Sequence, residues 1–538
     1  MNKKQGFIKG TAILMGANAI SKIFGAVFKI PLTYLLREEG MAIYNTAFSV
    51  YIMLLSFIIS GMPLAVSKLI AEETALNNNS NVRKIMTVST VLLGILGIFG
   101  TVVLWFFADF FAIAMKEPKA VFCLKVIAPS VFFVALGTVY KSYYQGKANM
   151  IPTAVSQVIE AFIKLLAGYA LALFYSKLAA QYTAAAAIMG VTVGEIIATF
   201  ILFVLYLPHR FRMPTGHAEK SVHEILSAIC AVSLPAIVAA AVSGAMNLVD
   251  ITVIRRCLEG IKFTSSGAAD FLRMYSSYTD VFDTLPQTLS ISADGSRWLY
   301  GAYSGYALTV FHLPVGILAS LGVSILPVIS GAIAVKNRQR ANFCAELAIK
   351  LTLLVCLPAA FGIALFSEPI LDFLFGNTAS SHMLSFLAPC LVFISLAQIY
   401  DAILNAGGSI IEPFLFGFIG AAVKLVCNFI FIRNQHLNML GTVISANIAY
   451  FVSMLLSFSC LQKRFGLSIN IKDIFIKPLL CSAAAAAVIY LLYPPFSVMF
   501  NSDKTALLGS GFVGAAVYAL TLLQTNCLSS KDIKMLFT

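Results

Sequence analysis

Residues 20–32, ISKIFGAVFKIPL, place two lysines, Lys22 and Lys29, inside a stretch that is otherwise apolar enough to cross a membrane. A charged side chain near the middle of a bilayer costs at least about 2.5 kcal/mol on insertion scales. Such residues therefore face a partner or a water-filled cavity more often than lipid. The stretch predicts a membrane helix with one functional polar face.

The composition of the chain predicts a polytopic membrane protein. Hydrophobic residues make up 59% of its 538 residues and charged residues 11%, and the mean hydropathy is +0.88. Soluble domains carry about 25% charged residues. The net charge of +13 is explained by the excess of Lys and Arg in the loops of one side, so we predict no nucleic-acid partner.

Fourteen apolar stretches approach or exceed the roughly 20 residues that span a bilayer. They lie at 8–36, 44–70, 85–108, 119–144, 152–176, 183–207, 226–254, 300–326, 345–366, 384–405, 412–433, 440–460, 474–494 and 504–525. The first is too long for a removable signal peptide and has no small-residue cleavage site, so we expect it to stay as an anchor. The even number and the loop charges predict that both termini are cytoplasmic.

Two local patterns indicate an internal duplication. SKLIA at 67–71 resembles SGAIA at 330–334, and QGKANMIP at 145–152 resembles AGGSIIEP at 406–413. Because six passes restore the starting side, the copies are predicted to be parallel repeats about an axis along the membrane normal. The predicted parts are an N-terminal six-helix lobe at 1–207, a cytoplasmic linker at 208–225, a C-terminal six-helix lobe at 226–465 with an external loop at 255–299, and two further helices with a tail at 466–538.

Four residues of the first helix form a polar stripe. Asn18, Lys22, Gly25 and Lys29 follow spacings of 4, 3 and 4, which place them on one helix face. Ammonium groups pair strongly with phosphate where water is scarce, so this face suits an anionic headgroup. The alternative is that the lysines snorkel toward the membrane surface, which fits Lys29, near the helix end, better than Lys22.

Further helices carry stripes of the same kind, which we interpret as cavity walls or ion-coupling positions. They comprise Ser243, Asn247 and Asp250; Gln398, Asp401 and Asn405; and Gln157, Glu160 and Lys164. Glu160 and Lys164 also have the i,i+4 spacing at which two opposite charges neutralise each other on one helix. Both interpretations remain open for that pair.

Catalytic and metal-binding motifs are not found in the sequence. There is no phosphate-cradling glycine loop, no GxSxG and no HExxH. Ten cysteines are scattered through apolar segments without a CxxC pair, so we interpret them as core residues and predict no metal and no cofactor. These observations predict a protein that is not an enzyme.

An ordered series of segments resembles one known family. The segments are ISKIFGAVFKIPL, YNTAFSVY, SGMPLAVSKLIAEE, YYQGKANMIPTAVSQVIE, LPAIVAAAVSGAMNLVD, PVGILASLGVSILPVISGAIA and LFSEPILDFLFG. Over roughly residues 6–500 they resemble the polysaccharide-biosynthesis branch of the multidrug/oligosaccharidyl-lipid/polysaccharide exporter superfamily, with lipid II flippases as close relatives.

The resemblance implies two six-helix lobes around a central cavity and the movement of an undecaprenyl-pyrophosphate-linked sugar to the outer leaflet. Lipid II flippases carry an S-R-x-x-G-x-x-R pattern in the first helix, which Ser21, Lys22 and Gly25 match with Lys for Arg. The second basic position falls on Phe28, one residue before Lys29. Two other charged positions of those flippases fall on uncharged residues here, near Tyr44 or Asn45 and near Thr309. These departures concern lipid II itself more than a polyprenyl-linked substrate in general.

The predicted function is alternating-access transport of a lipid-linked saccharide, with membrane lipids around the protein and a proton or sodium ion as the coupling cation. One alternative is a drug/cation antiporter of the same fold, which needs a carboxylate-lined cavity. A second is a membrane glycosyltransferase or sugar ligase that uses loop carboxylates, namely Asp270, Asp280, Asp283 or Asp294. A third is a scaffold of cell-wall or sporulation complexes without transport.

Overall fold

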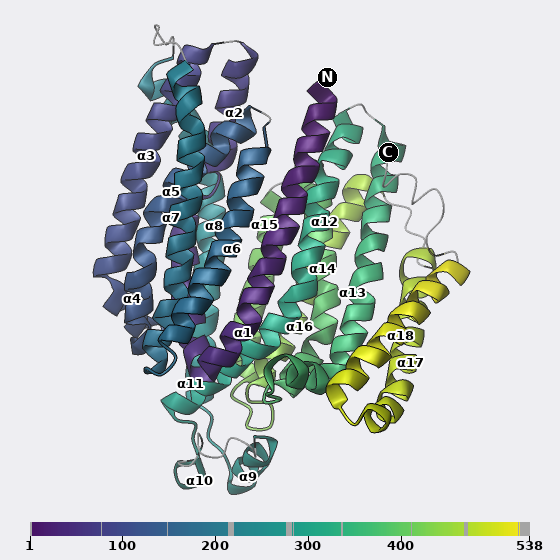
Figure 1. Cartoon of the computed structure of the whole chain (residues 1–538). Coiled ribbons are helices and arrows are strands. Elements are labelled where there is room, and N and C mark those ends of the chain that lie inside the picture. Colours follow the sequence, from purple (N-terminus) through teal and green to yellow (C-terminus); the bar gives the residue numbers. More distant parts are fainter. Residues whose placement is uncertain are drawn as a thin grey trace. The chain divides into compact units, whose positions relative to one another are not determined.

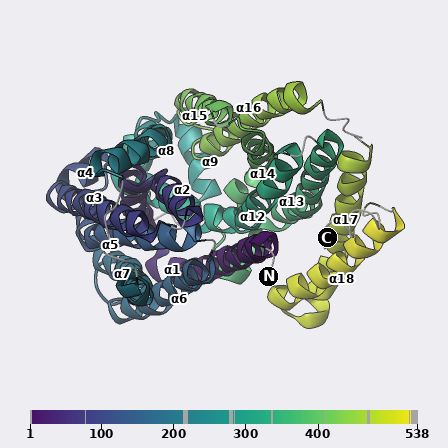
Figure 2. The same ribbon diagram turned by 90° about the horizontal axis from the view of Figure 1, so that it is seen from above.

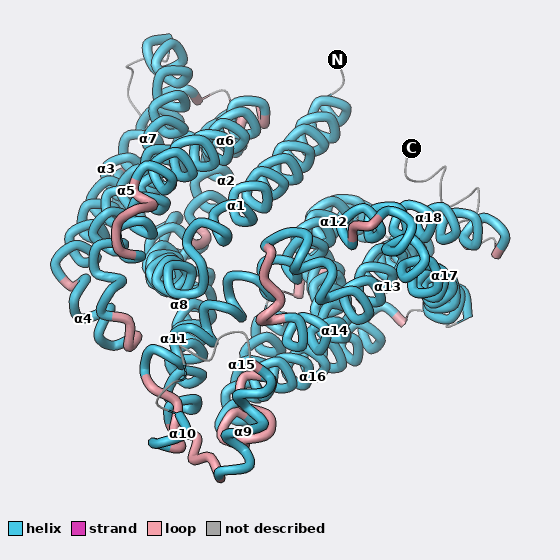
Figure 3. Tube along the Cα trace, turned by 60° about the horizontal axis from the view of Figure 1, so that its bottom comes forward, coloured by secondary structure: helices cyan, strands magenta, loops and turns pink. Residues whose placement is uncertain are grey.

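The computed structural model describes residues 3–76, 78–147, 149–212, 220–275, 282, 285–334, 337–409, 411–466, 472–525 and 527. Within these ranges every regular element is a helix and none is a strand (Figure 3). Twelve helical runs in the described part are long and apolar enough to cross a membrane. The predicted all-α, multi-pass membrane architecture is confirmed.

Two features reconcile these twelve runs with the fourteen predicted spans. The first run, Gly16–Thr74, covers the second predicted span and most of the first. Helix α8 (Val222–Glu259) covers the predicted span at 226–254. The predicted break after residue 36 is a kink inside α1 (Lys3–Ile59), where Arg37 has φ 53 and ψ −163.

Contacts between residues divide the chain into two compact units, residues 1–255 and 256–538. The first unit contains α1, α2 (Met62–Ala75), α3 (Asn79–Phe106), α4 (Ala108–Ala114), η1 (Pro118–Ala120), α5 (Val121–Gly146), α6 (Ile151–Phe174), α7 (Ala180–Arg212) and most of α8. Helix α5 packs against α1, α2, α3 and α7, while α6 packs along α1 and α7 (Figure 1). The predicted lobe boundaries and the parallel repeat stay predictions.

The end of the predicted linker is tied to the first unit by a buried carboxylate. Glu73 Oε1 lies 2.6 Å from Lys220 Nζ, and Asn81 Nδ2 donates to Glu73 Oε2 at 2.8 Å. Glu73 is 1% exposed. The part of the linker at 213–219 lies outside the described residues.

The second unit continues from the end of α8. It contains α9 (Ser265–Met274), α10 (Leu285–Thr288), α11 (Ala293–Ala302), η3 (Tyr303–Ala307), α12 (Leu308–Ala334), α13 (Arg338–Phe375), α14 (Ser381–Ala406), α15 (Ile411–Phe431), α16 (Leu440–Phe465), η4 (Lys472–Ile476), α17 (Lys477–Phe500) and α18 (Asp503–Gln524). Helix α14 packs against α12, α13 and α16. The two additional C-terminal helices, α17 and α18, lie side by side next to α13 (Figure 2), where the Tyr518 hydroxyl donates to the carbonyl oxygen of Leu354 at 2.7 Å.

The predicted external loop holds short helices around an aromatic cluster. Phe271 packs edge-to-face on Phe282 with ring centroids 5.0 Å apart, and Trp298 packs on Phe282 at 5.6 Å. The amide of Thr264 donates to Gln435 Oε1 at 2.8 Å, which ties the segment to the turn between α15 and α16. The described part of this loop is therefore a folded element with its own small core.

Candidate functional site

The polar stripe of α1 lies opposite the exposed apolar surface of that helix. Asn18, Gly25 and Lys29 are half-buried. The exposed apolar residues of the same stretch, about half a turn away, are Ile20, Ile23 and Val27. No neighbouring atom lies within 4 Å of the position that a Cβ would take on Gly25. We infer that lipid contacts the apolar side and that the polar stripe borders open space; the Lys22 side chain lies outside the described residues.

Helix α6 holds α1 in this orientation. The Ser21 hydroxyl donates to the carbonyl oxygen of Gln157 at 3.1 Å. About two turns further on, Phe28 is 3% exposed and packs against Gly168, where an added Cβ would be 2.9 Å from the Phe28 ring. These contacts use the side of α1 between the polar stripe and the exposed apolar residues, so the rotation of the helix about its axis is fixed by packing.

Lys164 of α6 places a second cation beside Lys29. Its Nζ lies 5.0 Å from the ring centroid of Phe48 and 5.9 Å from that of Phe28. These two rings come from opposite sides of the kink in α1. Lys29 and Lys164 are close enough to repel each other electrostatically. Within the described part of the chain, neither ammonium group has a carboxylate at ion-pair distance.

Glu160 pairs with a lysine of another helix. Its Oε2 lies 3.4 Å from Nζ of Lys141 on α5, and the two side chains are 28% and 22% exposed. Glu160 also interacts electrostatically with Lys164, its i,i+4 neighbour, so the alternative that these two charges neutralise each other stays a prediction. Glu195 of α7 lies within hydrogen-bond reach of Glu160. The pattern of spacings did not identify Lys141 or Glu195 as site residues; the signal that points to them is a single charge inside an apolar stretch.

The other predicted stripes are placed as follows. On α14, Asp401 Oδ1 accepts a hydrogen bond of 2.7 Å from the Ser457 hydroxyl of α16. Gln398, one turn earlier, is half-buried, and its Oε1 has no hydrogen-bond partner in the described structure. On α8, Asn247 is exposed and Asp250 is half-buried. Asp401 and Ser457 therefore form a small polar site between two helices of the second unit.

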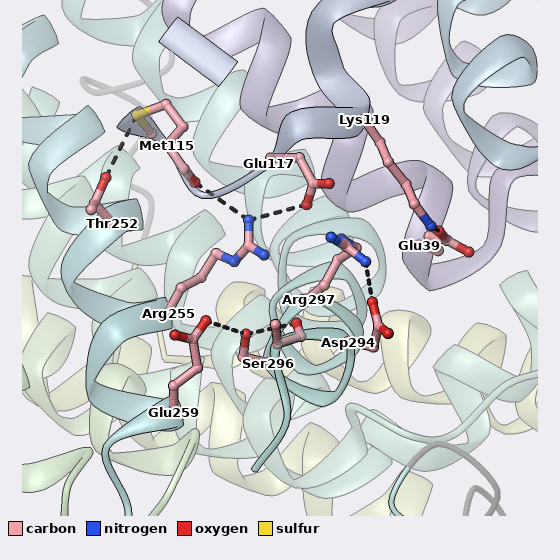
Figure 4. A network of polar contacts seen from close by, with 11 residues as sticks. Glu39, Met115, Glu117, Lys119, Thr252, Arg255, Glu259, Asp294, Ser296 and Arg297 are labelled. Atoms are coloured by element: carbon pink, nitrogen blue, oxygen red, sulfur yellow. Dashed lines mark hydrogen bonds and ion pairs between the residues drawn. The ribbon is translucent and has the colours of Figure 1, made fainter. Parts of the chain in front are cut away.

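A buried ion pair at the end of the first unit was missed by sequence reasoning. Arg255 Nη1 donates to Glu117 Oε2 at 3.0 Å and to the carbonyl oxygen of Met115 at 3.4 Å. The Thr252 hydroxyl donates to the sulfur of the same Met115 at 3.6 Å (Figure 4). The pair joins α8 to the turn between α4 and η1, and nothing in the local sequence connects residues so far apart.

The loop carboxylates of the second unit do not assemble a catalytic pair among the described residues. Asp294 forms an ion pair with Arg297 (Figure 4), and Asp270 is exposed. Asp280 and Asp283 lie outside the described residues. Among the described residues no group of three or more His, Cys, Asp and Glu is arranged to hold a metal ion.

Comparison with known proteins identifies similar chains. A family model for polysaccharide biosynthesis proteins matches residues 7–333, and one for the lipid II flippase MurJ matches residues 300–502. Stage V sporulation protein B of Bacillus subtilis (strain 168) is 24% identical over 99% of this chain and 98% of its own length. Lipid II flippase MurJ of the same organism is 21% identical over 86% of this chain and 84% of its own.

Solved structures show the same fold. The lipid II flippase MurJ in an inward closed conformation superimposes with a TM-score of 0.68 at 17% identity, covering 95% of this chain and 98% of that one. A multidrug resistance MATE family transporter of the MOP superfamily, in an inward-facing conformation, superimposes with a TM-score of 0.63 at 14% identity, covering 85% and 98%. At these identities the solved structures establish the fold of this chain.

Proposed function

This chain belongs to the polysaccharide biosynthesis protein family, and we propose that it is a flippase that carries an undecaprenyl-pyrophosphate-linked saccharide across the cytoplasmic membrane of a bacterium. The saccharide is a peptidoglycan precursor or another polysaccharide unit. Both termini are cytoplasmic in this proposal. The family, the fold and the names of the similar proteins support it.

The observation that carries the proposal is the pair of ammonium groups on Lys29 and Lys164. Both are half-buried in helices that cross the membrane, and neither has a carboxylate at ion-pair distance in the described part of the chain. Two neighbouring cations in such a place repel each other and lose hydration, so an anionic ligand stabilises them. The open space beside Gly25 leaves room for that ligand.

In the proposed mechanism, Lys22 and Lys29 bind the pyrophosphate, with Asn18 and Gly25 on the same face of α1 and Lys164 of α6 beside Lys29. The saccharide occupies the polar interior and the polyprenyl chain remains in lipid. Alternating access then moves the headgroup from one leaflet to the other. A coupling cation, proton or sodium, binds at carboxylates such as Asp401 or Asp250.

The drug/cation antiporter remains the alternative on the same fold, since a MATE transporter superimposes on this chain. Cationic drugs need a carboxylate-lined cavity, whereas the stripe on α1 carries lysines.

The alternative of a glycosyltransferase or sugar ligase needs the loop carboxylates for catalysis. Replacing Asp270, Asp280, Asp283 and Asp294 together with Asn is expected to leave transport intact, and a loss of transport in correctly inserted protein would support the enzyme.

The direct test is transport of a fluorescent undecaprenyl-pyrophosphate sugar by purified protein in liposomes. Lys29→Gln and Lys22→Gln should each reduce the transport rate about 10- to 150-fold, the equivalent of charge-assisted contacts of roughly 1.5 to 3 kcal/mol. Lys29→Glu and Lys22→Glu should reduce it further, because a carboxylate repels phosphate. Lys68→Gln, at an exposed position of α2, is the matched control.

A second measurement separates a cavity from snorkelling. Cys is placed at position 22 or 29 in a variant from which the ten native cysteines have been removed. A membrane-impermeant thiol reagent should label both positions. Normal transport by all the lysine variants, or failure to label either position, would refute the anion-binding face.

A further inference from the structure

Two carboxyl groups meet inside the first unit, where α6 and α7 come unusually close. An added Cβ on Gly190 would lie 2.3 Å from Cα of Gly168, and one on Gly194 would lie 3.0 Å from the carbonyl oxygen of Glu160. Only glycine allows this approach. The close packing brings the side chain of Glu195, the residue after Gly194, within hydrogen-bond reach of Glu160.

Charged and titratable groups face this carboxyl pair from every helix packed around it. Lys141 of α5 lies 3.4 Å from Glu160. Lys164 of α6 acts electrostatically on both carboxyl groups, and Lys29 of α1 acts on Lys164. Tyr51 of α1, which is 3% exposed, interacts electrostatically with both carboxyl groups.

The charges of this cluster can be counted. Lys29, Lys141 and Lys164 carry three positive charges, and ionised Glu160 and Glu195 carry two negative ones, so the net charge of the cluster is +1. One proton bound by the carboxyl pair raises this net charge to +2. Two carboxylates that share a site in a poorly hydrated interior seldom ionise together, because the second negative charge is repelled by the first. A hydrogen bond between two carboxyl groups also requires a proton on one of them.

We propose that Glu160 and Glu195 form a proton-binding site, and that the proton bound there raises the positive charge that Lys29 and Lys164 present to the pyrophosphate of the substrate. The proton comes from solvent and is held on a carboxyl oxygen between the two residues. By linkage, a ligand that binds the protonated state more tightly also promotes uptake of the proton. The coupling to substrate rests on the proposed function, whereas the proton site itself does not.

The proton site is tested first, without substrate. Infrared spectroscopy of the purified protein at neutral pH is expected to show the carbonyl band of a protonated carboxylic acid. Glu195→Gln should remove that band, whereas Glu72→Gln, at an exposed position on α2, should keep it. Absence of the band in the wild type, or its persistence in Glu195→Gln, overturns the proton site whatever the substrate is.

The coupling is tested with undecaprenyl pyrophosphate in detergent, with undecaprenol as the uncharged control ligand. Wild-type affinity should fall with rising pH as the proton is lost, by at most about tenfold per pH unit. The variant Glu195→Gln keeps Glu160 as the single carboxylate of the pair. The net charge of the cluster in this variant equals that of the protonated wild type. The affinity of the variant should therefore change less with pH than that of the wild type, because only the lysines and the pyrophosphate of the ligand still titrate.

Glu160→Gln is the second variant, because it also leaves one carboxylate and should reduce the pH dependence in the same way. A pH dependence that is the same in the wild type and in both variants overturns the coupling. Equal binding of undecaprenyl pyrophosphate and undecaprenol by the wild type overturns the anion site of the proposed function, and the infrared result then decides the proton site separately.

Discussion

The ion pair between Arg255 and Glu117 allows a quantitative prediction about stability. Its side chains are 1% and 0% exposed, and Nη1 lies 3.0 Å from Oε2. At that distance and an effective dielectric constant of about 20, the Coulomb attraction is roughly 5 to 6 kcal/mol. Glu117→Gln keeps the shape of the side chain and removes its charge. We expect it to reduce the free energy of unfolding by about 3 to 5 kcal/mol, because a guanidinium group stays buried without its main counter-charge.

The measurement is thermal unfolding of the purified protein in detergent, followed by the loss of the monodisperse folded species. At about 2 to 4 °C per kcal/mol for a unit of this size, the midpoint should fall by about 6 to 20 °C. The matched control is Glu72→Gln, since its partner Lys68 lies 3.9 Å away and the two side chains are 48% and 60% exposed. That change should alter stability by about 0 to 1 kcal/mol.

A double variant separates charge from packing. The double variant Glu117→Leu, Arg255→Met replaces both partners with apolar residues and removes both charges together. Such replacements often leave the free energy of unfolding unchanged or raise it. It should recover most of the stability that Glu117→Gln loses. If Glu117→Gln unfolds at the same temperature as the Glu72→Gln control, the pair contributes no more than an exposed one and the reasoning is refuted.

Three further predictions concern other parts of the chain. Gly190→Ala should lower the free energy of unfolding by about 1 to 3 kcal/mol, because the new Cβ would lie 2.3 Å from Gly168. The control Gly417→Ala, where no neighbour lies within 4 Å of the new Cβ, should raise it slightly. Thermal unfolding measures both variants, and equal shifts would contradict the close packing of α6 and α7. Trp298→Ala should expose the predicted external segment to added protease while liposome transport continues, and loss of transport would contradict a structural role for that segment. Asp401→Asn should remove the dependence of transport on a proton or sodium gradient, and an unchanged dependence would exclude this carboxylate as the coupling site.

The orientation of α1 was predictable because it depends on one helix alone. The 4, 3, 4 spacing of the polar stripe places Asn18, Gly25 and Lys29 on one face, and in the structure these residues are half-buried opposite the exposed apolar side. Helical periodicity converts sequence positions into directions without knowledge of any neighbour. The cytoplasmic orientation of the termini stays a prediction.

The partner of Glu160 was not predictable in this way. Spacing identifies only neighbours on the same helix, and it offered Lys164. The actual partner, Lys141, lies on the preceding helix, and Glu195 reaches the site only because Gly190 and Gly194 allow α7 to approach α6. Which charges pair between two helices depends on the distance between the helices where they cross, and the volume of the side chains there sets that distance. Residue spacing in a single sequence does not reveal it.

The position of Lys29 in the opening stretch can now be explained by its surroundings in the structure. Insertion into lipid penalises a lysine only if its ammonium group faces the hydrocarbon, and the exposed side of α1 near Lys29 is apolar. The packing of Phe28 against Gly168 then fixes Lys29 beside Lys164. A chain that needed only a stable helix would gain from replacing either lysine with an apolar residue, since two neighbouring half-buried cations destabilise the empty protein. The proposed function explains their presence by a ligand that carries negative charge, and the proposed proton site makes the strength of its binding depend on the ionisation of Glu160 and Glu195.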